Sequence, residues 1–253
     1  MTRIILHGCF GRMGKKVEAL IDQDENVEIV AGIDALEGNA KYPTFTNIDD
    51  CDIKADCIID FANAAAVDRL LDYCVAKKIP LVLCTTGLSD EQEKKVVESS
   101  KQVAILKSAN MSIGINLLDN VLRQISDTLA KSGFNIEVVE AHHNRKLDAP
   151  SGTALSLAHS IQDSLSESYE LVYDRSSRRQ ARPKNEIGVS AVRGGGIVGE
   201  HDIIFVSETE KIELSHTAFD RAVFASGAVA AAKYLQNKED GLYNMKEVIS
   251  QTR

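Results

Sequence analysis

One short stretch of the sequence, residues 140–154 (EAHHNRKLDAPSGTA), holds the side chains with the clearest chemical use. Its two adjacent histidines, His142 and His143, can each gain or lose a proton near neutral pH. Lys146 follows closely and adds a positive charge. This combination predicts a place where an anion is bound and a proton is delivered beside it.

A helix start lies in the same stretch, at Pro150–Thr153. Pro150 cannot extend the preceding element, Ser151 is a favourable N-cap, and Gly152 leaves the backbone amides unshielded. Free amides at a helix N-terminus attract anions, and nearby cations strengthen that attraction. We therefore expect a pocket for a carboxylate or a phosphate. The alternative is an ordinary capped helix that follows a polar loop.

A metal site is another use that these residue types allow. Four side chains are potential ligands of a zinc hydrolase: Glu140, His142, His143 and Asp148. Neighbouring histidines rarely bind one metal ion, however, and the other histidines lie far away in the sequence. We therefore expect no metal ion here.

A second motif is the glycine cluster Gly8–Gly14 (GCFGRMG), which follows an apolar strand and opens a helix. Glycines at this position permit a tight turn and a close approach of the backbone to a pyrophosphate. Asp34 lies twenty residues beyond Gly14, where an acidic side chain would bind ribose hydroxyls. The motif predicts a nicotinamide or flavin dinucleotide site, and the small size of the chain favours nicotinamide. A plain strand–helix turn is the alternative.

The elements around the glycine motif alternate between strand and helix. Near-continuous apolar runs indicate buried strands, and segments with helical periodicity separate them. This alternation is typical of a parallel sheet covered by helices on both faces. Strands are expected at Arg3–His7, Val27–Ile33, Cys57–Phe61, Pro80–Thr86 and Val103–Lys107, the last of which closes the series, and helices are expected up to Ile21, over Ala64–Lys77 and from a capping box at Ser89.

The pattern changes after about residue 112. A long amphipathic helix, Ile115–Lys131, is followed by strands that indicate an α+β region with a mixed or antiparallel sheet, and by a hairpin turning at Glu208–Glu210. Residues 166–186 are polar and predict an exposed excursion. Strands are expected near Asn135–Glu140, Ile187–Val192, Asp202–Ser207 and Ile212–Thr217, and two final helices near Asp220–Gln236 and Tyr243–Ser250.

Composition narrows the classes of partner. The 253-residue chain has a net charge of −8 and no apolar run long enough to span a bilayer. A nucleic-acid partner would need a basic face, so we expect neither nucleic acid nor membrane as a partner. The five cysteines are odd in number and lack C-x-x-C spacing, which is typical of reduced thiols in a cytoplasmic protein.

The chain resembles the dihydrodipicolinate reductases, also called 4-hydroxy-tetrahydrodipicolinate reductases. The similarity extends over essentially the whole chain, and the block Glu140–Ala154 is its most specific part. A glycine-containing hairpin at Val192–His201 adds to it. The other matching segments are Gly8–Gly14, Cys84–Gly87 (CTTG) and Ser108–Gly114 (SANMSIG).

The resemblance implies a reduction of 4-hydroxy-tetrahydrodipicolinate, a cyclic dicarboxylate, by hydride transfer from NADH or NADPH. The product is tetrahydrodipicolinate, on the route to diaminopimelate and lysine. His142 is implied as the general acid or base and Lys146 as a second proton donor. This agrees with the residue chemistry, because negative charge that builds during reduction needs nearby positive charge and then a proton. The implied substrate-binding residues are His143, Ser151, Gly152 and Thr153.

Fold, cofactor site and assembly are implied in the same way. We expect an α/β protein with a Rossmann-like parallel-sheet dinucleotide domain at residues 1–112 and 219–253. An α+β domain with a mixed sheet, at residues 113–218, is expected to bind substrate and to build a homotetramer. The implied cofactor-binding residues are Gly8, Cys9, Phe10, Gly11, Arg12, Met13, Asp34, Cys84, Thr85, Thr86, Ser108, Ala109, Asn110 and Met111.

Three departures from the family pattern concern the cofactor. Cys84 stands where the family usually has glycine, and Met111 replaces the usual phenylalanine. Ala35 follows Asp34 where some members have a basic residue that favours the 2′-phosphate of NADPH. Without that cation the Asp34 carboxylate should repel the 2′-phosphate, so we expect NADH to be preferred over NADPH. The alternative is that Arg12, Lys15 or Lys16 reaches that phosphate and favours NADPH.

Two other functions stay open. Another nicotinamide-dependent dehydrogenase, of the aspartate or homoserine type, would lack the His-His and Pro-Ser-Gly-Thr block. A non-catalytic relative that only senses the dinucleotide would bind cofactor without turnover, and the intact His142 and Lys146 argue against it.

Overall fold

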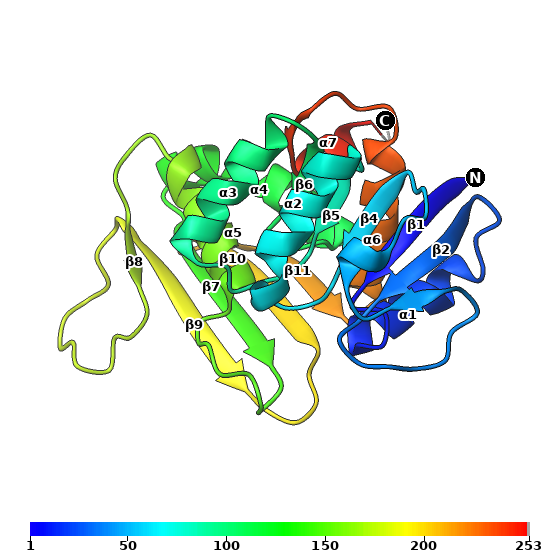
Figure 1. Ribbon diagram of the computed structural model, residues 1–253. Helices are drawn as coiled ribbons and strands as arrows, with labels where there is room; N and C mark the ends of the chain where they lie inside the picture. Colours follow the sequence, from blue (N-terminus) through cyan, green and yellow to red (C-terminus); the bar gives the residue numbers. More distant parts are fainter. Residues whose placement is uncertain (252–253) are drawn as a thin grey trace. The chain divides into compact units, whose positions relative to one another are not determined.

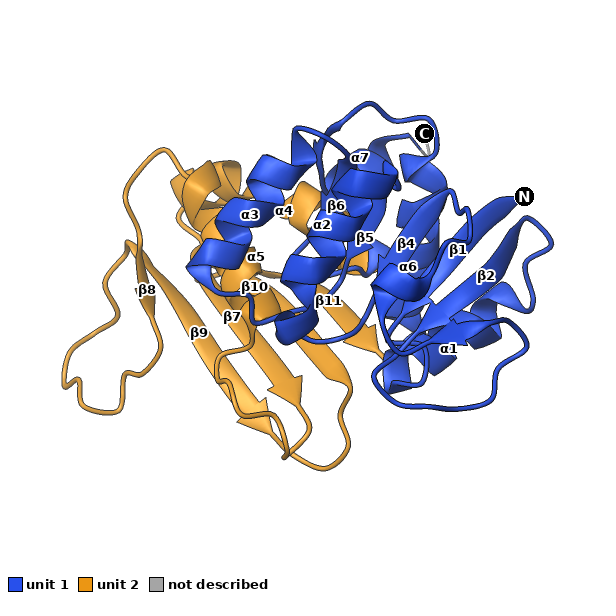
Figure 2. Cartoon of the chain, in the orientation of Figure 1, with its two compact units in different colours: residues 1–113, 221–253 blue, residues 114–220 orange. Residues whose placement is uncertain are grey.

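The computed structural model describes residues 1–251, and the chain divides into two compact units (Figures 1 and 2). Unit 1 contains Met1–Ile113 together with the C-terminal segment from Arg221, and unit 2 contains Gly114–Asp220. The expected divisions at 112/113 and 218/219 lie one and two residues before these boundaries. The C-terminal segment therefore returns to the unit that the N-terminal segment begins.

Unit 1 is built on a seven-stranded sheet with the order β12-β6-β5-β4-β1-β2-β3, in which every pair of neighbours is parallel. The strand order reverses between β1 and β4, which makes their carboxyl ends the place where such a sheet binds ligands. The strands are β1 (Thr2–His7), β2 (Val27–Ile33), β3 (Thr44–Phe45), β4 (Cys57–Asp60), β5 (Leu81–Leu83), β6 (Ala104–Lys107) and β12 (Gly241–Tyr243).

Alternation along β1 explains why helices cover both faces of this sheet. Ile4 and Leu6 point to one face, where they pack with α1 and α6, whereas Ile5 points to the other face, where it packs with α2 and α3. The helices are α1 (Arg12–Ile21), α2 (Val67–Lys77), α3 (Asp90–Ser100), α6 (Ala222–Leu235) and α7 (Met245–Ser250), with 3-10 turns at Ile48–Asp50 and Ala64–Ala66.

The expectation that Val103–Lys107 closes the series of strands is wrong. β12, from the C-terminal segment, pairs with β6 through Leu242 and Ile105 and forms the edge of the sheet. β12 has three residues and β3 has two, so neither shows an alternation that a sequence pattern can reveal.

Unit 2 contains a mixed five-stranded sheet with the order β11-β10-β7-β9-β8. β7, β10 and β11 are antiparallel, with the expected hairpin between the last two, whereas β7, β9 and β8 are parallel. The elements are α4 (Ile113–Lys131), β7 (Asn135–His142), α5 (Gly152–Ser164), β8 (Glu170–Val172), β9 (Glu186–Arg193), β10 (Gly199–Val206) and β11 (Lys211–Ala218).

The buried face of β7 changes in character along the strand. Ile136 and Val138 pack in a hydrophobic core with α4 and α5. Glu140 and His142 follow on the same face and are also buried. The strand thus brings two ionisable side chains to the end of an apolar core.

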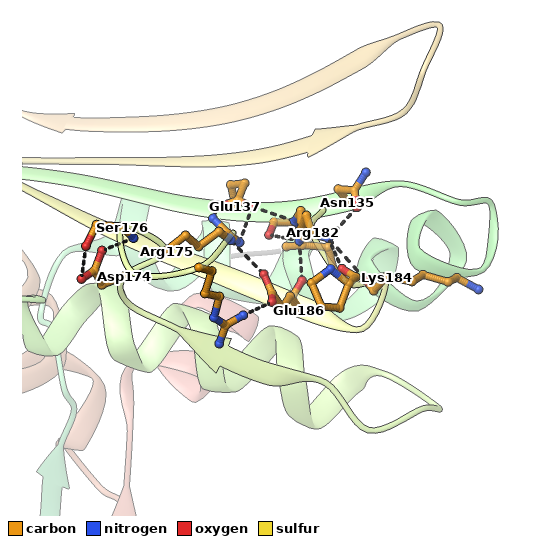
Figure 3. Close-up of polar contacts among 11 residues, drawn as sticks. Asn135, Glu137, Asp174, Arg175, Ser176, Arg182, Lys184 and Glu186 are labelled. Atoms are coloured by element: carbon orange, nitrogen blue, oxygen red, sulfur yellow. Dashed lines mark hydrogen bonds and ion pairs between the residues drawn. The ribbon is translucent and has the colours of Figure 1, made fainter. Parts of the chain in front are cut away.

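The expected excursion at 166–186 contains the short strand β8, and ion pairs connect the part after this strand to the sheet (Figure 3). Arg175 contacts Glu137 on β7 (Nη2–Oε1, 2.9 Å) and Glu186 on β9 (Nε–Oε1, 2.8 Å). Arg182 adds a contact from its Nε to Oε1 of Glu137 (3.0 Å). Gly188 opposite Glu137 leaves room for this arrangement, because a Cβ there would lie 1.8 Å from Oε2 of Glu137.

Candidate functional site

The glycine cluster in unit 1 forms a tight loop between β1 and α1. Gly8 has a φ of +80°, and a Cβ at this residue would lie 2.8 Å from the backbone of Phe61. A Cβ at Gly14 would lie 2.2 Å from the carbonyl oxygen of Gly8. The N-cap of α1 is Gly11, which supplies no side-chain acceptor for the first helical amides. These amides can therefore bind a pyrophosphate, and the cradle fits a dinucleotide.

Two cavities adjoin this loop in unit 1. All the predicted cofactor residues except Cys9 and Phe10 line one or the other. Arg12, Met13 and the predicted residues of the 84–86 and 108–111 segments line a cavity of about 490 Å³. Gly8, Gly11 and Asp34 line a cavity of about 410 Å³.

Asp34 is held in place by the glycine loop itself. Its Oδ2 accepts a hydrogen bond from the amide of Phe10 (2.9 Å), and its Oδ1 accepts one from the amide of Leu36 (3.1 Å). A carboxylate oxygen has room for a second donor, so Asp34 can also bind ribose hydroxyls. Cys9 instead points into the core, and Phe10 contributes its amide to the position of Asp34.

Beneath both cavities lies a buried polar group at the ends of β1 and β4. Asp60 accepts a hydrogen bond from Thr85 (Oγ1–Oδ2, 2.6 Å) and contacts Nδ1 of His7 through Oδ1 (2.7 Å). Its Oδ1 also accepts a hydrogen bond from the amide of Ala62 (3.1 Å). Asp60 therefore fixes the two loops that border the larger cavity.

The segment Ser108–Met111 is positioned by the C-terminal helices. The amide of Met245 donates a hydrogen bond to Oγ of Ser108 (2.8 Å), and α6 passes so close that a Cβ at Gly227 would lie 1.7 Å from the carbonyl oxygen of Met111. The return of the chain to unit 1 therefore shapes the cofactor cavity.

Several lining residues were not predicted from the sequence. Phe61 and Ala62 follow directly after β4 and line both cavities, and the rule that ligands lie at strand ends could have identified them. Arg221 and Phe224 line the larger cavity, and Arg69 lines the smaller one. No local motif marks these three, because they come from distant elements.

In unit 2, the predicted acid His142 lies at the end of β7 beside a buried carboxylate. Nδ1 of His142 is 2.6 Å from Oε2 of Glu140, whose exposed fraction is 0%. Arg193, at the end of β9, donates to both oxygens of Glu140 (2.6 and 2.7 Å), and the amide of Ser151 donates to Oε1 (2.9 Å). One carboxylate thus joins β7, β9 and the start of α5.

These contacts keep Glu140 charged. Burial alone would raise its pKa, but hydrogen bonds from Arg193, His142 and the amide of Ser151 outweigh that effect and lower the pKa below its usual value. The bond to Glu140 raises the pKa of Arg193 in turn. Burial, and then the nearby His142, lower the pKa of His201 to about 4.

Ser151 caps α5 as expected from the sequence. Its Oγ accepts a hydrogen bond from the amide of Ala154 (3.1 Å) and lies 3.3 Å from Nε2 of His201. Ser151 is buried, whereas Gly152 is exposed and has no other atom within 4 Å of a Cβ built on it. The start of α5 is therefore open to an anion at Gly152.

Lys146 belongs to the loop between β7 and α5. Its amide donates to the carbonyl oxygen of His143 (3.1 Å), and its Nζ contacts Asp148 (3.0 Å). The carbonyl oxygen of Asp148 accepts a hydrogen bond from Nη2 of Arg193 (2.7 Å). The loop that carries Lys146 is thus fastened to the same arginine that holds Glu140.

Within residues 1–251 no cluster of three or more histidine, cysteine, aspartate or glutamate side chains could hold a metal ion. No helix in that described part of the chain is long and apolar enough to cross a membrane.

A parallel α/β unit with a dinucleotide cradle, together with a unit that pairs a histidine with a buried carboxylate near an exposed helix start, defines a two-domain nicotinamide-dependent reductase. The chain belongs to the dihydrodipicolinate reductase family. The family model described as "Dihydrodipicolinate reductase, N-terminus" matches residues 2–111, and "Dihydrodipicolinate reductase, C-terminus" matches residues 114–249.

Individual relatives agree over nearly the full length. A 4-hydroxy-tetrahydrodipicolinate reductase of Clostridium novyi (strain NT) is 50% identical over 250 residues, covering 98% of each chain. One of Clostridium tetani (strain Massachusetts / E88) is 47% identical, covering 97% of this chain and 96% of the relative. The solved structure of a dipicolinate-bound dihydrodipicolinate reductase from Paenisporosarcina sp. TG-14 has a TM-score of 0.81 at 24% identity, covering 98% of this chain and 99% of that one.

Proposed function

We propose that this protein catalyses the NAD(P)H-dependent reduction of 4-hydroxy-tetrahydrodipicolinate to tetrahydrodipicolinate, a step toward diaminopimelate and lysine. The observation that carries the proposal is the bond between His142 and the buried Glu140, which is joined to the anion-binding start of α5 through Ser151. The names of the 50% and 47% identical relatives support the substrate.

The reaction consumes one hydride and one proton and releases water. The bound nicotinamide supplies the hydride. His142 donates the proton from Nε2, since its Nδ1 is engaged by Glu140. Lys146 stabilises the negative charge that builds on the ring and acts as a second proton donor. His143 and the amides of Gly152 and Thr153 hold a carboxylate of the substrate.

NADH is the preferred cofactor in this proposal. Asp34 lines the smaller cavity, where its negative charge opposes the 2′-phosphate of NADPH, and Ala35 beside it carries no charge. Arg69 is the cation of that cavity that could favour the phosphate, and its Nε is bound to Asp49 (2.6 Å). The carboxylate of Asp49 offsets much of the attraction that Arg69 would exert on the 2′-phosphate.

One assay tests both parts of the proposal. Substrate is generated by the preceding synthase, and the oxidation of NADH and NADPH is followed in wild type, His142→Gln and Lys146→Ala. We expect a higher kcat/KM with NADH, and a loss of about 10²–10⁴-fold in kcat in each variant, with unchanged cofactor affinity.

Other outcomes would point elsewhere. Turnover of aspartate semialdehyde or oxaloacetate with ammonia, but not of this substrate, would identify a homoserine- or aspartate-type dehydrogenase. Tight NADH binding by folded wild type without turnover would identify a sensor. A higher kcat/KM with NADPH would contradict the cofactor preference alone.

A homotetramer in the cytoplasm completes the proposal. In unit 2, α4 and α5 pack on one face of the mixed sheet. Among residues 114–220 no helix packs on the opposite face, which carries the apolar side chains of Val139, Ala141 and Ile204. The five free cysteines suit a reducing compartment.

A further inference from the structure

Glu140 makes no contact with the reacting atoms in the proposed reaction, yet it is bonded to the histidine that donates the proton. Its Oε2 receives Nδ1 of His142 and Nη1 of Arg193, and its Oε1 receives Nη2 of Arg193 and the amide of Ser151. Four donors therefore converge on two buried oxygens.

The chemistry of these donors fixes the hydrogen on the imidazole ring. A carboxylate only accepts hydrogen bonds, so Nδ1 of His142 must carry a hydrogen. In the neutral ring Nε2 then has a lone pair and no hydrogen. Nε2 lies beside Gly199, where a Cβ would be 3.1 Å away, so the absence of a side chain there leaves space at this nitrogen.

We propose that Glu140 is a positioning residue of the reduction, which fixes the tautomer of His142 and the start of α5 at the same time. The inference depends on the role of His142 in the proposed function. The proton donor is the ring with hydrogens on both nitrogens. When its Nε2 releases a proton to the substrate, the electron pair of that N–H bond stays on Nε2, the hydrogen on Nδ1 stays hydrogen-bonded to Glu140, and the neutral tautomer remains. Glu140 remains a carboxylate throughout, and Arg193 balances its charge.

Glutamine at position 140 would reverse the tautomer. The amide of Ser151 and the guanidinium of Arg193 can only donate. The single oxygen of the glutamine would therefore take the position of Oε1, where it accepts from the Ser151 amide and from Nη2 of Arg193. Its NH₂ group would then face Nη1 of Arg193, which can only donate, and His142, whose ring is the one of these partners that can become an acceptor. In the neutral ring Nδ1 would then have no hydrogen and Nε2 would carry it. Protonation of the ring for catalysis would place a hydrogen on Nδ1 against this NH₂ group, and the two donors would still face each other after Nε2 released its proton.

The experiment compares full-length wild type, Glu140→Gln and Glu137→Gln. The nitrogen chemical shifts of the His142 ring, assigned with His142→Gln and recorded where the ring is neutral, identify the tautomer without any substrate. Glu137→Gln is the matched control, because Glu137 lies on the same strand and is also held by arginines (Figure 3). It points to the opposite face of β7 from His142.

We expect the hydrogen on Nδ1 in wild type and Glu137→Gln, and on Nε2 in Glu140→Gln. The kcat should fall by about 10²–10⁴-fold in Glu140→Gln, while the kcat of Glu137→Gln stays within about twofold of wild type. The NADH affinity of both variants should also stay within about twofold of wild type. A wild-type ring with its hydrogen on Nε2, or a Glu140→Gln enzyme with wild-type kcat, would overturn the inference.

Gly199→Ala keeps the test open if Glu140→Gln does not fold. This substitution leaves Glu140 and the tautomer of His142 unchanged but places a methyl group against Nε2. The kcat should therefore fall by about tenfold or more, while the nitrogen chemical shifts of the His142 ring stay as in wild type. An unchanged kcat would show that Nε2 is not the donor and would overturn the inference. Failure of the proposed function looks different: His142→Gln itself would keep wild-type turnover, whatever tautomer the spectra report.

Discussion

His201 and His142 lie with their ring centres 5.3 Å apart, but the structure treats the two rings differently. His142 has a carboxylate partner, whereas His201 is buried at 3% exposure beside the hydroxyl of Ser151. The two neighbouring histidines therefore differ in role: in the proposed reaction His142 carries charge, whereas His201 lies against the N-cap Ser151 and burial lowers its pKa.

The low pKa of His201 predicts a pH-dependent stability. The unfolded chain binds a proton at His201 below about pH 6.5, while the folded protein, with the pKa of this residue at about 4, does not. Stability from this group is therefore present above pH 6.5 and is lost as the pH falls toward 4. Between about pH 7 and pH 5, wild type should lose about 2 kcal/mol more unfolding free energy than His201→Gln.

Urea unfolding of both proteins at the two pH values measures this difference. Glutamine keeps a polar group near Ser151 but does not titrate, so any constant effect of the substitution cancels. Equal losses in the two proteins would mean that His201 is protonated in the folded state.

Many residues of the candidate site could be predicted from the sequence, whereas the side chains that hold those residues in position could not. The glycine loop, Asp34 and the segments at 84–86 and 108–111 follow from local motifs at strand ends. From the sequence, Glu140 is indicated only as a possible metal ligand. Its partner Arg193 is 53 residues away, and no pattern around either residue predicts that the two form an ion pair. Contacts between distant strand ends become visible only in three dimensions.

At the scale of elements, α6 determines the form of the cofactor cavity. Its small side chains let it lie close to the sheet, and Gly227 lets it lie against the carbonyl oxygen of Met111. The sequence predicts this helix by its periodicity, but the need for glycine at this position comes from a segment more than one hundred residues earlier.

Gly227→Ala tests this packing. Alanine normally stabilises a helix interior by about 1 kcal/mol relative to glycine. Here its Cβ would lie 1.7 Å from the oxygen of Met111, so we expect the unfolding free energy to fall by about 1–3 kcal/mol. NADH binding, followed by fluorescence, should weaken because Met111 lines the cavity.

The control for this substitution is Gly152→Ala, where no other atom lies within 4 Å of the added Cβ. Its stability and NADH affinity should match those of wild type, with a change in stability within about 0.5 kcal/mol. A Gly227→Ala protein that is as stable as wild type and binds NADH normally would show that α6 can shift without consequence.

At the scale of the whole molecule, the proposed assembly depends on the face of the unit 2 sheet on which neither α4 nor α5 packs. Light scattering on wild type should give four times the mass of one chain. Ile204→Glu places a charge on that face and should lower the mass. Leu242→Glu, an equally drastic change at an exposed apolar residue of unit 1, should leave the mass unchanged. A wild-type monomer would contradict the tetramer.

The return of the chain to unit 1 also has a consequence for synthesis. A ribosome completes every residue of unit 2 before it reaches α6, β12 and α7. Until then, the sheet face formed by Ile4, Leu6 and Ile59 lacks α6, one of the two helices that cover it. The nascent chain therefore contains all of unit 2 while unit 1 is still incomplete. The apolar sheet face of unit 1 stays partly exposed until α6 is synthesised, and exposed apolar surface of this kind favours aggregation.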